Sequence, residues 1–390
     1  MHHPFFVIGI ARSGTNLLAR MIDRHPEAVC ALDPLLPYFK MLRNKIVQGE
    51  GDNSLQRQVP VDAPFLDTYF LSHGPRLLDL LTSANGRWQL AAAEQAELRR
   101  AVVDRAGLES PELAAALAKA SGEDTRTFLD DMLGIIGNSK AGATRSGSKE
   151  VWAIDFLPLL ARTYPQARFF LIERDPRAIV ASLFAMGEQD SSQAAHFISY
   201  CRHWRKAVAL ARQLRADSLY ASRVQIVSYE RLVREPLLVA KEVCAHLGIA
   251  FREEMLEVSA GGWAGNSSYG ENQGIYAQSL EKWRNALGPA NIAAIEFLCA
   301  PEMALTDYGF SPDAFGILTP EIEQVFRAAD SSQASWRSDI GQVSLDLGGE
   351  LLRYDLIRSN LDFQDALVRE CFLSVPVLQS IKAAVAEQLH

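Results

Sequence analysis

A short loop near the start of the chain carries residue types suited to binding an anion. An uninterrupted apolar run over residues 5–10 predicts a buried parallel strand, and the spacing of apolar residues over 17–22 predicts a helix. The loop over 9–16 therefore precedes a helix N-terminus, where unpaired N–H groups and the helix dipole attract an anion. Gly14 lets the backbone approach that anion. We expect a phosphorylated ligand here.

The same loop lacks the charge-handling groups of a nucleoside-triphosphatase. Gly9 and Gly14 have the spacing of a G-x-x-x-x-G-K-[ST] loop. Thr15 stands where that loop has its lysine, and Asn16 stands where it has the magnesium-binding hydroxyl. The cation lies inside the loop instead, at Arg12.

A second strand-to-helix turn follows later in the chain. The apolar run over 169–172 predicts a strand, which ends at Arg174, and Pro176 opens a helix at a position where its missing N–H costs nothing. Ser182 lies eight residues after Arg174. Ligands of doubly wound sheets bind at the carboxyl ends of the strands, so both turns could face one ligand. The alternative is an ordinary helix cap followed by a solvated charge at Arg177.

Together the two turns resemble the motifs of sulfotransferases that depend on 3′-phosphoadenosine-5′-phosphosulfate (PAPS). The family's 5′-phosphosulfate loop reads P-[RK]-S-G-T-[ST], and here Ala11 and Asn16 depart from it. The family's 3′-phosphate motif, Arg-Asp-Pro-Arg with a serine eight residues beyond, is complete. The resemblance implies PAPS as donor, adenosine 3′,5′-bisphosphate as product, a hydroxyl or, as a second choice, an amine as acceptor, and no metal. It also implies a set of cofactor-binding residues: Arg12, Ser13, Gly14, Thr15, Asn16, Arg174 and Ser182.

The same resemblance assigns roles to four more residues. Lys149 would contact the sulfuryl group and neutralise charge on the leaving phosphate, as Arg12 would from the loop; the alternative is an ordinary surface lysine. Tyr229 would approach the adenine, or would be a core tyrosine. Ser268 and Lys282 resemble late cofactor contacts of the family, in a glycine-rich segment that folds over the nucleotide.

The general base is suggested by residues 25–34, which resemble a stretch of the tyrosylprotein sulfotransferases. Asp33 falls where those relatives place a catalytic glutamate. A partly buried carboxylate there could accept the proton of a hydroxyl acceptor. The alternative is that Asp33 only organises a turn. His73, His196 and His203 are rival bases without a surrounding motif.

These elements predict an α/β fold: a P-loop-like three-layer sandwich with a central parallel sheet. We expect a sulfotransferase core over 1–310, interrupted by a mainly helical insertion over 44–145 that serves as a lid, and a helical C-terminal extension over 311–390. The polar stretches 48–53 and 138–148 are interpreted as hinges. The extension could add buried area, shape the acceptor pocket or exchange between subunits of a homodimer.

Composition fits an enzyme of this kind. The 390 residues are 48% hydrophobic, enough for a large core, and a net charge of −8 argues against a nucleic-acid surface. Five scattered cysteines, no apolar run approaching 18 residues and no signal peptide predict reduced thiols, no transmembrane segment and a cytoplasmic location. The acceptor could be a small molecule such as a polyketide-like metabolite, a carbohydrate, a lipid or a peptide.

Two other classes of function stay open. An ATP-dependent, kinase-like phosphotransferase would share the strand, loop and helix, but it would need a divalent metal and the missing loop lysine. A non-catalytic nucleotide-binding protein would keep both phosphate loops and lack a general base.

Overall fold

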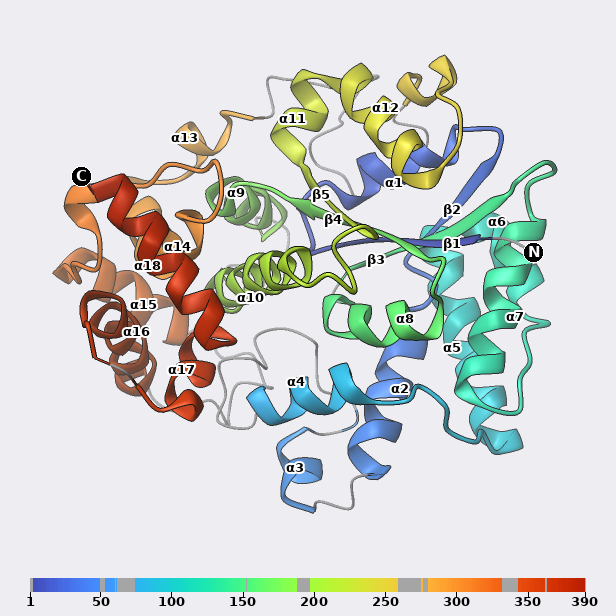
Figure 1. The fold of residues 1–390 in the computed structure, drawn as a ribbon, viewed down its shortest axis with the longest axis horizontal. Helices are drawn as coiled ribbons and strands as arrows, with labels where there is room; N and C mark the ends of the chain where they lie inside the picture. The colour runs from blue at the N-terminus through green and yellow to red at the C-terminus, as the bar shows by residue number, and fades with distance from the viewer. Residues whose placement is uncertain are drawn as a thin grey trace.

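A five-stranded parallel sheet forms the centre of the molecule (Figure 1). The computed structural model describes residues 3–49, 53–59, 61, 74–151, 153–187, 197–258, 275, 280–331, 343–361 and 363–389. The strand order is β2-β3-β1-β4-β5, and every neighbouring pair is parallel. The strands are β1 (His3–Gly9), β2 (Ala28–Leu32), β3 (Arg145–Val151), β4 (Arg168–Glu173) and β5 (Val224–Ser228).

Helices cover both faces of the sheet, which confirms the predicted three-layer α/β fold. Phe5 and Val7 of the central strand β1 pack toward α1 (Thr15–Asp23), α11 (Tyr229–Arg234) and α12 (Pro236–Leu247). Phe6 and Ile8 point to the opposite face. That face is covered by α2 (Leu36–Gly49), α8 (Leu157–Thr163) and α10 (Phe197–Ala216). Because β1 is buried on both faces, it reads as a continuous apolar run.

The described part of the segment between β2 and β3 is mainly helical. Its further helices are α3 (Asn53–Gln58), α4 (Gly74–Ser83), α5 (Ala92–Glu109), α6 (Pro111–Leu117) and α7 (Thr125–Asn138). Helix α7 ends at Asn138 and β3 begins at Arg145, so the connection between them is shorter than the polar stretch 138–148, and its role as a hinge stays a prediction. Small residues in β3 permit close packing: a Cβ at Gly147 would lie 2.4 Å from the carbonyl oxygen of Phe5. The assignment of 44–145 as a lid stays a prediction.

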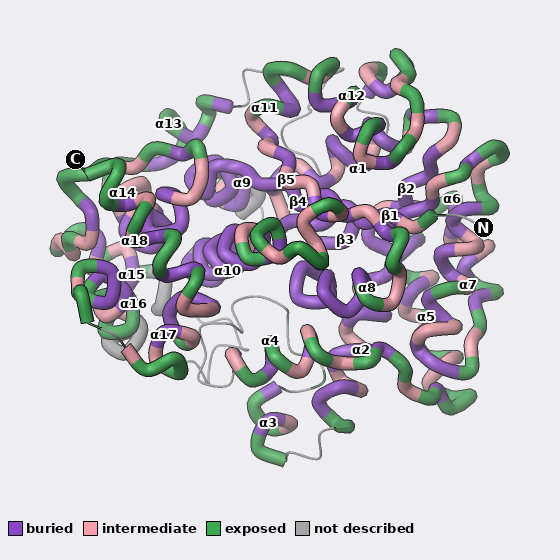
Figure 2. Tube along the Cα trace, in the orientation of Figure 1, coloured by how far each residue is buried: buried purple, intermediate pink, exposed green. Residues whose placement is uncertain are grey.

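The C-terminal helices pack beside α9 (Pro176–Gly187) and α10 (Figure 1). They are α13 (Trp283–Ala286), α14 (Pro289–Met303), α15 (Pro320–Ser331), α16 (Val343–Arg358), α17 (Asp365–Phe372) and α18 (Val375–Leu389). Figure 2 shows α10 buried over most of its length among them. Within the described ranges, no helix has the length and apolar character needed to cross a membrane.

A buried cluster of charged side chains joins α16 to α10 and α14. Glu350 accepts hydrogen bonds from Arg202 Nε at 3.3 Å and Arg205 Nη2 at 3.1 Å, and Arg353 pairs with Glu302. All five side chains are buried. Burial alone would raise the pKa of Glu350, but the neighbouring arginines lower it to about 2. The C-terminal helices therefore share one interior with the rest of the molecule.

Candidate active site

The loop between β1 and α1 has the backbone geometry of an anion-binding turn. Gly14 precedes α1 with φ 97°, a left-handed conformation that glycine adopts without strain. A Cβ at Gly14 would lie 2.2 Å from the ring of Tyr229, so this position also needs glycine for space. The Ser13 hydroxyl donates to the carbonyl oxygen of Ile10 at 2.8 Å and fixes the turn. Because the first N–H groups of a helix lack a carbonyl partner in a preceding turn, the start of α1 can offer hydrogen-bond donors to an anion in this loop.

The two predicted phosphate motifs meet directly. Arg12 Nε donates to Ser182 Oγ at 2.8 Å, and Arg174 Nη1 donates to the carbonyl oxygen of Arg12 at 2.9 Å. The Arg174 guanidinium stacks on the ring of Tyr229 at 4.3 Å, while Tyr229 also packs in the core. The contacts form because β1 and β4 are adjacent parallel strands, so their carboxyl ends lie together.

This meeting point concentrates positive charge. Burial, and then the charge of Arg174, lower the pKa of Arg12. Two neighbouring, partly desolvated guanidinium groups repel each other, and a bound anion would relieve that repulsion. Asn16 Oδ1 is buried and has no hydrogen-bond partner among the residues that the structure describes. Thr15 is buried beside it. These residues fit a doubly phosphorylated ligand.

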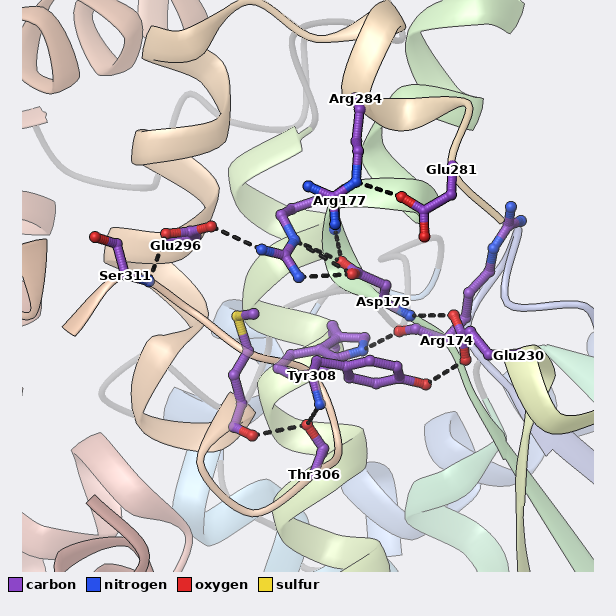
Figure 3. Close-up of polar contacts among 12 residues, drawn as sticks. Arg174, Asp175, Arg177, Glu230, Glu281, Arg284, Glu296, Thr306, Tyr308 and Ser311 are labelled. Atoms are coloured by element: carbon purple, nitrogen blue, oxygen red, sulfur yellow. Dashed lines mark hydrogen bonds and ion pairs between the residues drawn. The ribbon is translucent and has the colours of Figure 1, made fainter. Parts of the chain in front are cut away.

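The turn that carries Arg174 is held by a charged network (Figure 3). Arg177 donates to Asp175 through Nε at 3.0 Å and Nη2 at 2.7 Å, and to Glu296 through Nη1 at 2.7 Å. Its guanidinium also stacks on Trp283 at 4.4 Å. Arg177 is buried, so its interpretation as a solvated charge is wrong. Asp175 does cap the helix, because its Oδ1 accepts from the Arg177 N–H at 2.8 Å.

Asp33 and Lys149 form a buried ion pair at the adjacent ends of β2 and β3. Both side chains are almost fully buried, so the interpretation of Lys149 as a surface lysine is wrong. Asp33 has φ 51°, and its Oδ1 accepts from the Val151 N–H at 3.0 Å. Arg105 of α5 lies 3.5 Å from Asp33 Oδ2, and its Nε donates to the Asp33 carbonyl oxygen at 3.3 Å. The Asp33 carboxylate therefore lies beside a lysine, and Arg105 from the inserted helices adds a second cation.

Glu150 was not predicted and lies next to Lys149 in β3. It accepts hydrogen bonds from Ser148 and, at 2.9 Å, from the N–H of Leu35 just before α2. Its Oε2 is buried without a hydrogen-bond partner in the described part of the chain. Burial, and then the nearby Asp33, raise the pKa of Glu150 to about 8. Its only sequence signal is a charged residue next to a lysine.

The other predicted residues are distributed differently. Lys282 is exposed just before α13, and the contacts described for the site do not include it. His203 is fully buried in α10, where burial lowers its pKa well below the usual range. That environment makes His203 a poor candidate for a base in contact with an acceptor. Ser268, His73 and His196 lie outside the described residues.

Comparison with known proteins shows which family the chain belongs to. The model of the sulfotransferase family matches residues 4–253. A "Putative protein-tyrosine sulfotransferase" of Caenorhabditis elegans is 25% identical over 142 residues, 34% of this chain and 52% of the relative. Another with the same description, from Caenorhabditis briggsae, is 21% identical over 257 residues, 64% of this chain and 67% of the relative.

A solved structure described as the sulfotransferase domain of the Synechococcus PCC 7002 olefin synthase is 18% identical to this chain. The alignment has a TM-score of 0.48 and covers 80% of this chain and 96% of that domain. The chain matches 52% of the length of the first curated relative. The family model covers residues 4–253, which is more than half of the 390 residues, and the chain therefore belongs to the sulfotransferase family.

Proposed function

We propose that this sulfotransferase uses PAPS and transfers the sulfuryl group in line to a hydroxyl acceptor. The observation that carries the proposal is the contact between the two phosphate motifs: Arg12 bonds to Ser182, and Arg174 bonds to Arg12. A nucleotide with phosphates on both its 3′ and 5′ positions would use both motifs at once, whereas ADP or ATP would leave the 3′ motif without its anion.

Each part of the site has a role in this proposal. The loop over 12–16 would hold the 5′-phosphosulfate, Arg174 and Ser182 the 3′-phosphate, and Tyr229 the adenine side. Bound PAPS would supply the sulfuryl group as an electrophile. Lys149 would stabilise charge on the leaving phosphate.

The proposal makes Asp33 the general base for the acceptor hydroxyl. In the structure, the Asp33 carboxylate contacts Lys149, the Val151 N–H and Arg105. These three contacts fix its position. A carboxylate so held can accept a proton only from an acceptor that reaches this end of β2. The curated relatives' description makes a tyrosine of a protein one acceptor to test, beside carbohydrates, lipids and other small molecules. Ser268 and Lys282 as cofactor contacts, a cytoplasmic location and a homodimer belong to the proposal as well.

Calorimetric titration of the purified protein with adenosine 3′,5′-bisphosphate, ADP and ATP, each with and without magnesium, tests the proposal. We expect a metal-independent preference for the bisphosphate. A preference for ATP with magnesium would refute the proposal in favour of a kinase-like phosphotransferase. Binding of the bisphosphate without sulfuryl transfer to any member of a broad acceptor panel would instead support a non-catalytic nucleotide-binding protein.

A further inference from the structure

The peptide group between Arg174 and Asp175 is held at both ends. Trp204 Nε1 of α10 donates to the carbonyl oxygen of Arg174 at 2.9 Å. The N–H of Asp175 donates to Glu230 Oε1 of α11 at 3.0 Å. Rotation of this peptide plane would break both bonds. Because the plane adjoins the Cα atom of Arg174, its orientation sets the direction in which that side chain leaves the backbone.

Tyr308 links the two residues that hold this peptide group (Figure 3). Its hydroxyl donates to Glu230 Oε2 at 2.7 Å, and its ring lies 6.4 Å from the ring of Trp204 with an interplanar angle of 50°. Burial, and then the charge of Glu230, raise the pKa of the Tyr308 hydroxyl well above its ordinary value, so it stays protonated and remains a donor.

Trp204, Glu230 and Tyr308 come from three separate segments that converge on one peptide group. Tyr308 follows α14 and lies beyond the residues that the family model matches. Arg174 would otherwise be oriented by its bond to the carbonyl oxygen of Arg12 and its stacking on Tyr229. Those two contacts involve the guanidinium and leave the backbone of Arg174 to be fixed by other residues.

We propose that Trp204, Glu230 and Tyr308 are positioning residues that orient Arg174 toward the 3′-phosphate of the bound nucleotide. The inference rests on the proposed function, because it assumes that Arg174 recognises a 3′-phosphate. Misplacing a charged group by a fraction of its hydrogen-bond length weakens its contact with an anion. Loss of the Tyr308 hydroxyl should therefore weaken recognition of the 3′-phosphate and spare recognition of the 5′-phosphate.

The test compares Tyr308→Phe with wild type and with the control Tyr354→Phe. Tyr354 is also a buried tyrosine, and its hydroxyl donates at 2.6 Å to the carbonyl oxygen of Phe297, far along the chain from the two motifs. Calorimetry measures the affinity for adenosine 3′,5′-bisphosphate and for adenosine 5′-monophosphate. We expect Tyr308→Phe to lose about fivefold to tenfold in the preference for the bisphosphate, and Tyr354→Phe to keep the wild-type preference.

The ratio of the affinities for the bisphosphate and the monophosphate separates a positioning role from a general structural role, because a loosened fold would weaken the binding of both nucleotides alike. An unchanged ratio in Tyr308→Phe would overturn the inference. If that variant does not fold, Trp204→Phe removes the donor to Arg174 and keeps an aromatic ring, and the same ratio decides. A wild-type protein that shows no preference for the 3′-phosphate would refute the proposed function itself.

Discussion

Replacing Glu350 with glutamine tests how much the buried ion cluster stabilises the fold. Glu350 contacts Arg202 and Arg205 of α10 inside the protein. Its pKa is lowered from 4.5 to about 2, and a shift of that size corresponds to about 3 kcal/mol in favour of the folded carboxylate. Because the neutral side chain also leaves buried guanidinium groups uncompensated, we expect Glu350→Gln to lose about 3–5 kcal/mol at pH 7.

The sign of the pH dependence follows from the direction of this shift. A carboxylate with a depressed pKa in the folded state stabilises the protein fully above its unfolded pKa of 4.5. That contribution declines as the pH falls from 4.5 toward 2. Glutamine does not titrate, so the difference in stability between wild type and Glu350→Gln should shrink over this range.

Urea unfolding midpoints measured between pH 7 and about pH 3 provide the assay. The control is Glu242→Gln, because Glu242 pairs with Arg231 at 2.6 Å on the surface, where both side chains are over one-third exposed. We expect a loss of at most about 1 kcal/mol for this control. A wild-type-like midpoint for Glu350→Gln at pH 7, or a difference that stays constant down to pH 3, would refute the reasoning.

Three further substitutions probe the site. Asp33→Asn should abolish sulfuryl transfer and leave binding of adenosine 3′,5′-bisphosphate intact, since it removes the proposed base; residual turnover near the wild-type rate would assign the base elsewhere. Arg174→Ala should weaken bisphosphate binding in calorimetry by on the order of 2 kcal/mol or more, and unchanged affinity would contradict its assignment. The pKa of Glu150 is raised from 4.5 to about 8, so the folded protein keeps a proton that the unfolded chain releases above pH 4.5. Wild type should therefore lose stability as the pH rises from 4.5 to 8. Thermal unfolding of Glu150→Gln should lack that decline, and parallel pH curves for the two proteins would show that Glu150 does not cause it.

The sequence predicts the parts of the site that depend on local patterns. An apolar strand, a glycine before a helix and a proline at a helix start locate both phosphate motifs, and parallel pairing of β1 and β4 then brings Arg12 and Arg174 together. Prolines that can open a helix also indicate where helices start in the insertion and in the extension, as at Pro111 for α6 and Pro320 for α15.

Elements whose buried charges are compensated by residues far away in the sequence cannot be predicted from such local patterns. Strand β3 reads as polar because it carries Lys149 and Glu150, whose partners Asp33 and Leu35 are more than 100 residues away. Helix α16 was not predicted, since buried charges such as Glu350 resemble a solvated helix face. Arg105, Trp204 and Tyr308 also make their contacts with residues far away in the sequence, so nothing in the sequence around them indicates a contact with the site.

The pairing of Arg205 with Glu350 has a consequence for the order in which the chain is made. All five strands are complete by Ser228, yet the carboxylate that compensates Arg205 is synthesised 145 residues after it. At a synthesis rate of about 5–20 residues per second, the ribosome needs on the order of 10 s to produce that stretch. During this interval α10 carries charges that cannot enter a dry interior without their partner. A nascent chain halted before α16 should therefore hold its sheet without a closed core around α10, and protease digestion of stalled ribosome complexes would reveal that late closure.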